Sequence, residues 1–110
     1  MRVNGRTIQA KGEFTYHLGT ENRTTVKGAD RIHGYSSEPG EPMIEGALTD
    51  EPGLDLKAMF EVRDATVTLE LLNGKTIVLR DAWYAGDGTI KTGEGEASLK
   101  FVGLSAQEVT

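Results

Sequence analysis

The stretch ATVTLELLNGKTIVLR (residues 65–80) contains two β-rich runs joined by Asn73-Gly74, and it is the clearest structural signal in the chain. Asn-Gly between such runs is typical of a β-hairpin, because both residues tolerate the positive φ angles of a type I′ turn. A two-residue loop would pair Leu69 with Val78 and Thr68 with Leu79. One face would then carry Val67, Leu69, Leu71 and Val78. The other face would combine Thr68, Glu70 and Leu72 with Ile77 and Leu79, which is apolar enough that we expect something to cover it.

Further strands are predicted on both sides of this hairpin. Residues 43–49 and 96–102 alternate apolar and polar side chains with the period of half-buried strands. Shorter β-like runs lie at residues 7–9, 13–16 and 24–26, and residues 81–84 extend the second strand of the hairpin. The total is six to eight strands.

One segment has a helical period instead. Leu56, Met59, Phe60 and Arg63 fall at i, i+3, i+4 and i+7, and Pro52 with the acidic Glu51 and Asp55 suits a helix start. This predicts one short helix of two to three turns, with Met59 and Phe60 packed in the core. The expected fold class is therefore mainly β, a small sandwich or barrel with one flanking α-helix.

Length and composition set further limits. At 110 residues and 11.9 kDa, the chain is predicted to form a single domain over 1–110. The absence of cysteine excludes disulfides, thiolate metal sites and cysteine nucleophiles. A net charge of −5 argues against tight binding of nucleic acid through its phosphates. No apolar run approaches the length of a membrane span, and residues 4–6 are too polar for a signal-peptide core, so we expect synthesis in the cytosol.

Residues 17–42 form a weakly apolar, glycine- and proline-punctuated segment, which we expect to be a long loop or arm that is either disordered or ordered by a partner such as neighbouring subunits. Residues 1–37 carry six basic and three acidic side chains, whereas residues 38–64 carry two and eight. This separation fits either an ordinary solvated surface or a self-complementary one in which copies of the chain meet. For the second case, the expected interface residues are Arg23, Lys27, Arg31, Tyr35, Glu38, Glu41 and Trp83.

Residues capable of catalysis are few. His17 and His33 lack the spacing of a metal-binding helix, and Gly86-Asp87-Gly88-Thr89 lacks the Lys-Ser/Thr ending of a phosphate loop. Glu45 and Glu70 could be imagined as a glycosidase pair, and Trp83 with Tyr84 as a carbohydrate platform, but solvated carboxylates and interface aromatics are the simpler interpretation. The sequence therefore predicts no catalytic, cofactor-binding or metal-binding residues.

Several segments resemble the tail tube protein of Mu-like contractile-tailed phages and prophages. They are YSSEPGEPMIEGALT (35–49), DLKA (55–58), DATVTLELLNGKTIVLRDAWYAGDG (64–88), GEGE (93–96) and FVG (101–103). The resemblance covers nearly the whole chain and is most specific in its second half. It implies a structural virion protein rather than an enzyme, located in the phage tail and assembled in the host cytoplasm.

The resemblance also implies a β-sandwich or barrel with one helix, like that of type VI secretion tube rings. Six copies would close into a ring, and rings would stack into a hollow tube through which DNA passes without specific binding. Its partners would be the tail sheath, tape-measure, baseplate and tail-terminator proteins. Carboxylates and hydroxyls in the lumen would repel phosphates, and the lumen candidates are Glu45, Thr68 and Glu70. Alternatives are a type VI secretion-like ring protein, a small ligand-binding β-barrel and, least favoured, a hydrolase.

Overall fold

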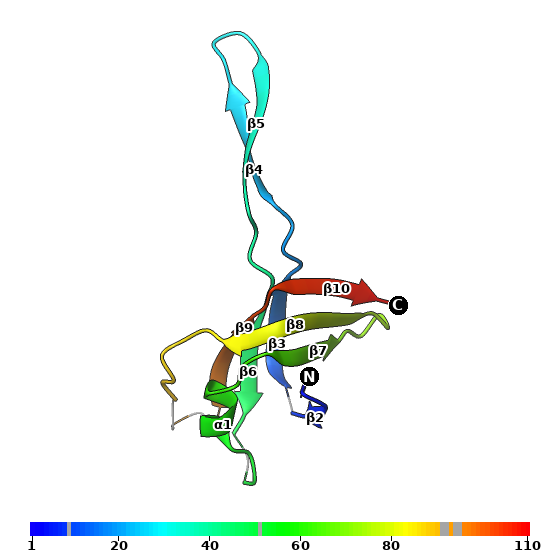
Figure 1. Ribbon diagram of the computed structural model, residues 1–110, viewed down its shortest axis with the longest axis vertical. Helices are drawn as coiled ribbons and strands as arrows, with labels where there is room; N and C mark the ends of the chain where they lie inside the picture. Colours follow the sequence, from blue (N-terminus) through cyan, green and yellow to red (C-terminus); the bar gives the residue numbers. More distant parts are fainter. Residues whose placement is uncertain (9, 51, 91–92, 94–95) are drawn as a thin grey trace.

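The computed structural model describes residues 1–8, 10–50, 52–90, 93 and 96–110, and these form ten strands and one short helix (Figure 1). The mainly β fold class is confirmed. Expectations that involve Gln9, Glu51, Glu94 and Gly95 lie outside the described residues. In chain order, the elements are β1 (Arg2–Val3), β2 (Arg6–Thr7), β3 (Ala10–His17), β4 (Asn22–Lys27), β5 (Ile32–Glu38), β6 (Met43–Thr49), α1 (Leu56–Phe60), β7 (Ala65–Glu70), β8 (Thr76–Tyr84), β9 (Glu96–Val102) and β10 (Ser105–Val109).

Eight strands form one antiparallel sheet that folds over itself at β8. The order is β2-β1-β7-β8-β9-β6-β3, with β10 also paired to β8. Residues 76–80 of β8 pair with β10 on one side, while Trp83 and Tyr84 at its end pair with β9. We call β2-β1-β7-β8-β10 sheet A, and β9-β6-β3 with the end of β8 sheet B. In Figure 1, the strands of one sheet cross those of the other steeply, as in orthogonally packed sandwiches.

A bulge in β8 makes this change of sheet possible. Ala65 pairs with Ala82 and Val67 with Leu79, so β8 contains one more residue than β7 between these pairs. Within the extra length, Asp81 has a φ of +52°, in the left-handed region that aspartate tolerates better than most residues. Bulges bend a strand and increase its twist. The bulge therefore redirects β8 from sheet A into sheet B.

The chain also changes sheet between β9 and β10, and it passes close to the β8 bulge. The Leu104 N–H donates to the Arg80 carbonyl at 3.1 Å, and the Gly103 N–H donates to the Pro42 carbonyl at 3.1 Å. A Cβ on Gly103 would lie 2.6 Å from the Arg80 carbonyl oxygen. Glycine is therefore the residue that permits this crossing.

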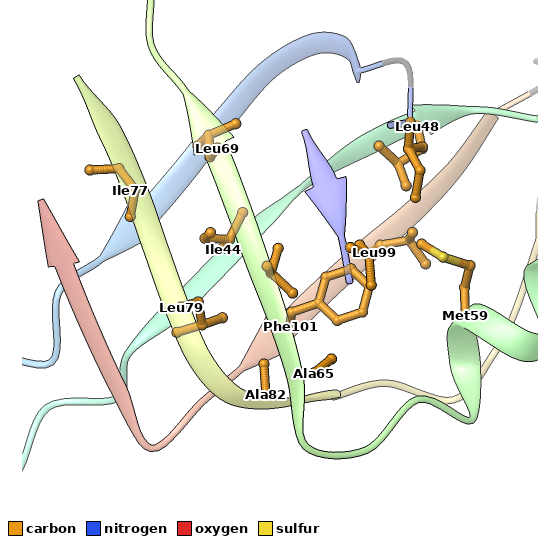
Figure 2. Close-up of a cluster of buried hydrophobic side chains, with 13 residues drawn as sticks. Ile44, Leu48, Met59, Ala65, Leu69, Ile77, Leu79, Ala82, Leu99 and Phe101 are labelled. Carbon is orange, nitrogen blue, oxygen red and sulfur yellow. The ribbon is translucent and has the colours of Figure 1, made fainter. Parts of the chain in front are cut away.

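The core lies between the two sheets and is closed at one end by α1 (Figure 2). Both sheets contribute aliphatic side chains, and Phe101 lies among them with only 1% of its surface exposed. Asp55 is the helix N-cap and accepts a hydrogen bond from the Ala58 N–H at 3.1 Å. The buried cluster comprises Val3, Ile8, Ile44, Leu48, Met59, Ala65, Val67, Leu69, Ile77, Leu79, Ala82, Leu99 and Phe101.

The helix is shorter than the period suggested, with five residues and no helical Arg63. Leu56 and Met59 are buried and Phe60 is half-buried, so the apolar stripe was identified correctly. Asp64, with a φ of +50°, then turns the chain into β7. The expected packing of Met59 in the core is confirmed.

The register predicted for the 65–80 hairpin is wrong by one residue. The observed pairs are Leu69 with Ile77 and Thr68 with Val78. The Leu71 N–H donates to the Lys75 carbonyl at 2.8 Å, and the Gly74 N–H donates to the Leu71 carbonyl at 3.1 Å. The loop is thus three residues long, with Gly74 at φ +91° and Asn73 outside the positive-φ region, as in a type I turn with a glycine bulge.

This shift changes which side chains face the core. Ile77 and Leu79 join Val67 and Leu69 on the inner face, and all four are buried. The outer face of the hairpin then carries Thr68, Glu70, Thr76, Val78 and Arg80. This face is less apolar than the two-residue loop implied, although Val78 on it is buried.

The other strand predictions are largely confirmed, but the ten described strands exceed the predicted six to eight, because β1 and β2 have two residues each and β10 has no alternation of buried and exposed residues. The runs at residues 43–49 and 96–102 match β6 and β9 at both ends, and Ile44, Leu48, Leu99 and Phe101 point inward as their alternation indicated. Residues 81–84 do extend β8. The runs at 13–16 and 24–26 lie inside β3 and β4, and β2 covers only the first residue of the 7–9 run.

Residues 22–38 form a hairpin that projects from the sandwich, and we call it the arm. Its strands β4 and β5 pair only with each other, and every residue of both is exposed. The arm extends along the longest dimension of the molecule, which measures 61 × 32 × 26 Å (Figure 1). None of its residues belongs to the buried core. The sandwich is therefore complete without it.

Candidate subunit interface

The arm presents two chemically different faces. Cross-strand partners in a hairpin lie on the same side, so the register tells which residues share each face. Arg23 pairs with Ser37, Thr25 with Tyr35, and Lys27 with Ile32. These six residues form what we call the basic face. The Arg23 guanidinium lies 4.8 Å from the centre of the Tyr35 ring, and its Nε is 2.6 Å from the carboxylate of Glu21. The opposite face contains Asn22, Thr24, Val26, Gly34, Ser36 and Glu38.

The tip of the arm combines charge with exposed apolar surface. The Gly28 N–H donates to the Arg31 carbonyl at 2.7 Å and closes the turn. Ile32 follows directly and is 66% exposed. Among the described residues, neither Lys27 nor Arg31 forms an ion pair. The tip therefore offers an aliphatic side chain between two free cations.

The base of the arm is fixed to sheet B. The Gly19 N–H donates to His17 Nδ1 at 2.9 Å, and Gly19 packs closely against the ring of Pro42. Glu41 forms an ion pair with Lys100 at 3.1 Å. The two chain segments also approach each other here, because a Cβ on Gly40 would overlap the Thr20 carbonyl. The arm thus leaves the body through a narrow, hydrogen-bonded neck.

A hollow of about 570 Å³ lies at the other end of the body, and we call it the α1 hollow. Trp83, which is 39% exposed, forms one wall. Tyr84 packs against Phe60, with ring centroids 4.6 Å apart and the ring planes tilted by 38°. Within the described part of the chain, Glu61 and Asp64 on the rim have no ion-pair partner. The lining residues are Phe60, Glu61, Val62, Arg63, Asp64, Trp83 and Tyr84.

The expected interface residues are thus divided between separate regions. Arg23, Lys27 and Tyr35 share the basic face, and Arg31 lies at the tip. Glu38 is on the opposite face of the arm, Glu41 is at its base and Trp83 is in the α1 hollow. Sequence reasoning missed Ile32 and Val62. The signal for Ile32 was a single large aliphatic residue in an otherwise polar segment, whereas Val62 had no signal of its own.

The three lumen candidates do not share a surface. Thr68 and Glu70 lie on the outer face of sheet A, where Thr68 Oγ1 is 3.5 Å from the Arg2 carbonyl and Glu70 is 3.9 Å from the Arg2 guanidinium. Glu45 is exposed on the outer face of sheet B, opposite Thr15 and Lys100. Because both sheets pack on one core, these outer faces point away from each other.

Because Glu45 and Glu70 lie on outer faces that point away from each other, they cannot act together as a glycosidase pair. Tyr84 is packed against Phe60, so it does not form a flat platform with Trp83. Residues 86–89 form a loop with a bend at Gly86, in which Asp87 accepts a hydrogen bond from the Thr89 N–H at 3.0 Å, and this bond holds the pKa of Asp87 below its ordinary value. The residues described contain no group of three or more potential metal ligands, and no helix among them is long and apolar enough to cross a membrane.

The family model and the individual relatives that match this chain indicate the same family. The family model described as phage tail tube protein matches residues 1–108. The chain is 29% identical over 109 residues to the Mu-like prophage FluMu tail tube protein of Haemophilus influenzae, covering 99% of this chain and 91% of that protein. It is 23% identical over 109 residues to the tail tube protein of Escherichia phage Mu, covering 99% and 90%. Because this family model matches nearly the whole chain, the chain belongs to the phage tail tube protein family, whose members are structural components of the virion tail.

Proposed function

We propose that six copies of this chain close into a ring and that the rings stack into the inner tube of a phage tail, through which DNA is delivered. The observation that supports this most directly is the arm, whose strands β4 and β5 are exposed at every residue and pair with no other described strand of the chain. Val26, Ile32 and Tyr35 leave large apolar surfaces in water there. A segment of this kind gains stability when a neighbour covers it.

The lumen is proposed to be lined by the outer face of sheet A. Thr68 and Glu70 lie there, and threonines 66 and 76 add hydroxyl groups on the same side. Arg80 is exposed on this surface, but the carboxylate of Glu70 lies close to the guanidinium of Arg2 and offsets its attraction for phosphates. A net charge of −5 acts in the same direction. DNA would then slide past without being held.

The remaining partners follow from this role. A tube of stacked rings needs a sheath outside it, a tape-measure protein inside it, a baseplate at one end and a terminator at the other. We propose these four tail proteins as partners and the host cytoplasm as the place of assembly. The acidic and basic segments of the chain support assembly through contacts between unlike patches, which is the geometry of cyclic rings.

The proposal is tested by electron microscopy of the purified chain, with light scattering at increasing concentration. The expected particles are rings with a central hole and short stacks of rings. They should loosen in high salt because contacts between exposed charges are screened. A particle that stays monomeric at high concentration and is indifferent to salt would contradict the proposal.

A matched variant separates assembly from folding. Residues 21–39 are replaced by Asn-Gly, since Thr20 and Gly40 already approach each other at the neck. The buried core contains no arm residue, so the variant should unfold at nearly the same temperature as the parent chain. It should form no stacks. An armless chain that still stacks would show that the arm is not what joins the copies.

A further inference from the structure

We propose that the tip of the arm of one copy binds in the α1 hollow of a second copy, with Ile32 as the apolar anchor. This rests on the proposed function and adds the acceptor site. The arm tip and the α1 hollow lie on different elements of the same chain, at opposite ends of the molecule (Figure 1).

Chemically, the tip and the hollow are complementary. Ile32 is 66% exposed at the tip, and the hollow offers the apolar surfaces of Phe60, Val62 and Trp83. Burying an aliphatic side chain among aromatic ones removes apolar area from water on both partners. Central apolar anchors of this type dominate the binding energy of many interfaces.

Charge adds a second match. Lys27 and Arg31 flank Ile32 without ion-pair partners in the described residues, and the same holds for Glu61 and Asp64 on the rim of the hollow. One charge of opposite sign is present on each side, Asp30 at the tip and Arg63 on the rim. The tip therefore keeps one net positive charge and the rim of the hollow one net negative charge, and these attract each other.

The positions of tip and hollow decide the kind of assembly. The arm projects at one end of the longest axis, whereas α1 lies at the other end (Figure 1). A contact between different patches at opposite ends repeats head to tail, and such a series stays open unless its rotation closes it. We therefore assign this contact to copies in successive rings, where it would set the stacking of the tube.

Cysteine cross-linking tests the contact directly, because the chain has no cysteine of its own. An Ile32→Cys chain is mixed with a tagged Val62→Cys chain, allowed to assemble and oxidised. A disulfide needs the two Cβ atoms within a few ångströms, so a mixed dimer on a non-reducing gel is expected. Thr24→Cys, on the opposite face of the arm, is the matched control and should cross-link to Val62→Cys far less.

The doubly substituted chain, Ile32→Cys with Val62→Cys, distinguishes stacking from ring closure. Successive rings should give a ladder of bands that continues beyond six copies. A ladder that ends at six would overturn the assignment to successive rings. Stacked rings without any mixed dimer would overturn the arm-to-hollow contact and leave the proposed function intact, whereas a chain that never assembles would overturn both.

Charge reversal provides an independent test. Lys27→Glu with Arg31→Glu, or Glu61→Lys with Asp64→Lys, should reduce stacking at least about tenfold, which corresponds to about 1.4 kcal/mol. Mixing the two variants, or combining all four substitutions in one chain, should restore it. Unchanged thermal unfolding shows that each variant is folded. Equal loss in the fourfold variant and in the separate variants would refute the pairing.

Discussion

Gly103→Ala is expected to destabilise the sandwich by about 2 kcal/mol, although it adds only one methyl group. The new Cβ would lie 2.6 Å from the Arg80 carbonyl oxygen and 2.9 Å from atoms of the Leu79 side chain. Overpacking of this kind costs about 1–3 kcal/mol. The Arg80 carbonyl cannot move away freely, because Arg80 pairs with Ser105 of β10 and the adjacent Leu79 pairs with Val67 of β7.

Two smaller effects act on the same substitution. Displacing the Arg80 carbonyl weakens its hydrogen bond with the Leu104 N–H, which contributes about 1 kcal/mol. Alanine also restricts the unfolded chain, which offsets about 0.4–1 kcal/mol. The sum of these effects predicts a thermal unfolding temperature lower by about 10 °C for a chain of this length.

The assay is thermal unfolding followed by circular dichroism, with Gly93→Ala as the control. A Cβ on Gly93 would meet no atom of the described residues within 4 Å, and Gly93 has no positive φ. Its substitution should therefore change stability by less than about 0.5 kcal/mol. Equal unfolding temperatures for the two variants would show that the connection between β9 and β10 does not pass as close to β8 as described.

Three further outcomes are expected. Asp81→Val should lower the free energy of unfolding in urea by about 1–2 kcal/mol, because a β-branched side chain disfavours the left-handed conformation. Asp81→Gly should be tolerated, and an equal loss of stability in both variants would contradict the role of φ. Asp55→Ala should cost about 1 kcal/mol in the same assay through loss of the helix cap, and an unchanged urea midpoint would count against it. The hydrogen bond with Glu108 raises the pKa of Lys75 above 10.5, so its stabilisation is present below that pH and is lost as the pH rises through the raised value. Glu108→Gln should flatten this alkaline decline in a series of urea titrations, and an identical decline in both chains would refute the assignment.

The sequence was sufficient to predict the strands that have one buried face. In β6 and β9, the alternation of large aliphatic and polar residues coincides with the core and solvent sides, so even the strand ends agree. The Asn73-Gly74 hairpin was also recognised. Its register was not, because an Asn-Gly pair fits both a two-residue loop and a three-residue loop with a glycine bulge, and the two differ by one residue.

The arm could not be predicted in detail for a physical reason. Both of its faces are exposed, so its residues show no alternation between core and solvent, and only the short run at residues 24–26 indicated a strand. The tertiary proximity of Phe60, Val62 and Trp83 was likewise invisible. This proximity depends on the bulge at Asp81, which no local sequence pattern predicts. That residues 17–42 are ordered by neighbours stays a prediction.

The bulge at Asp81 also has a consequence for any structure built from many copies. Because β8 belongs to both sheets, the backbone angles at one residue set the angle between the two halves of the sandwich. In a repeating assembly, a small rotation within each copy is added again at every step. A change of a few degrees in the backbone angles at Asp81 would therefore alter the helical pitch or the inner diameter of the whole filament.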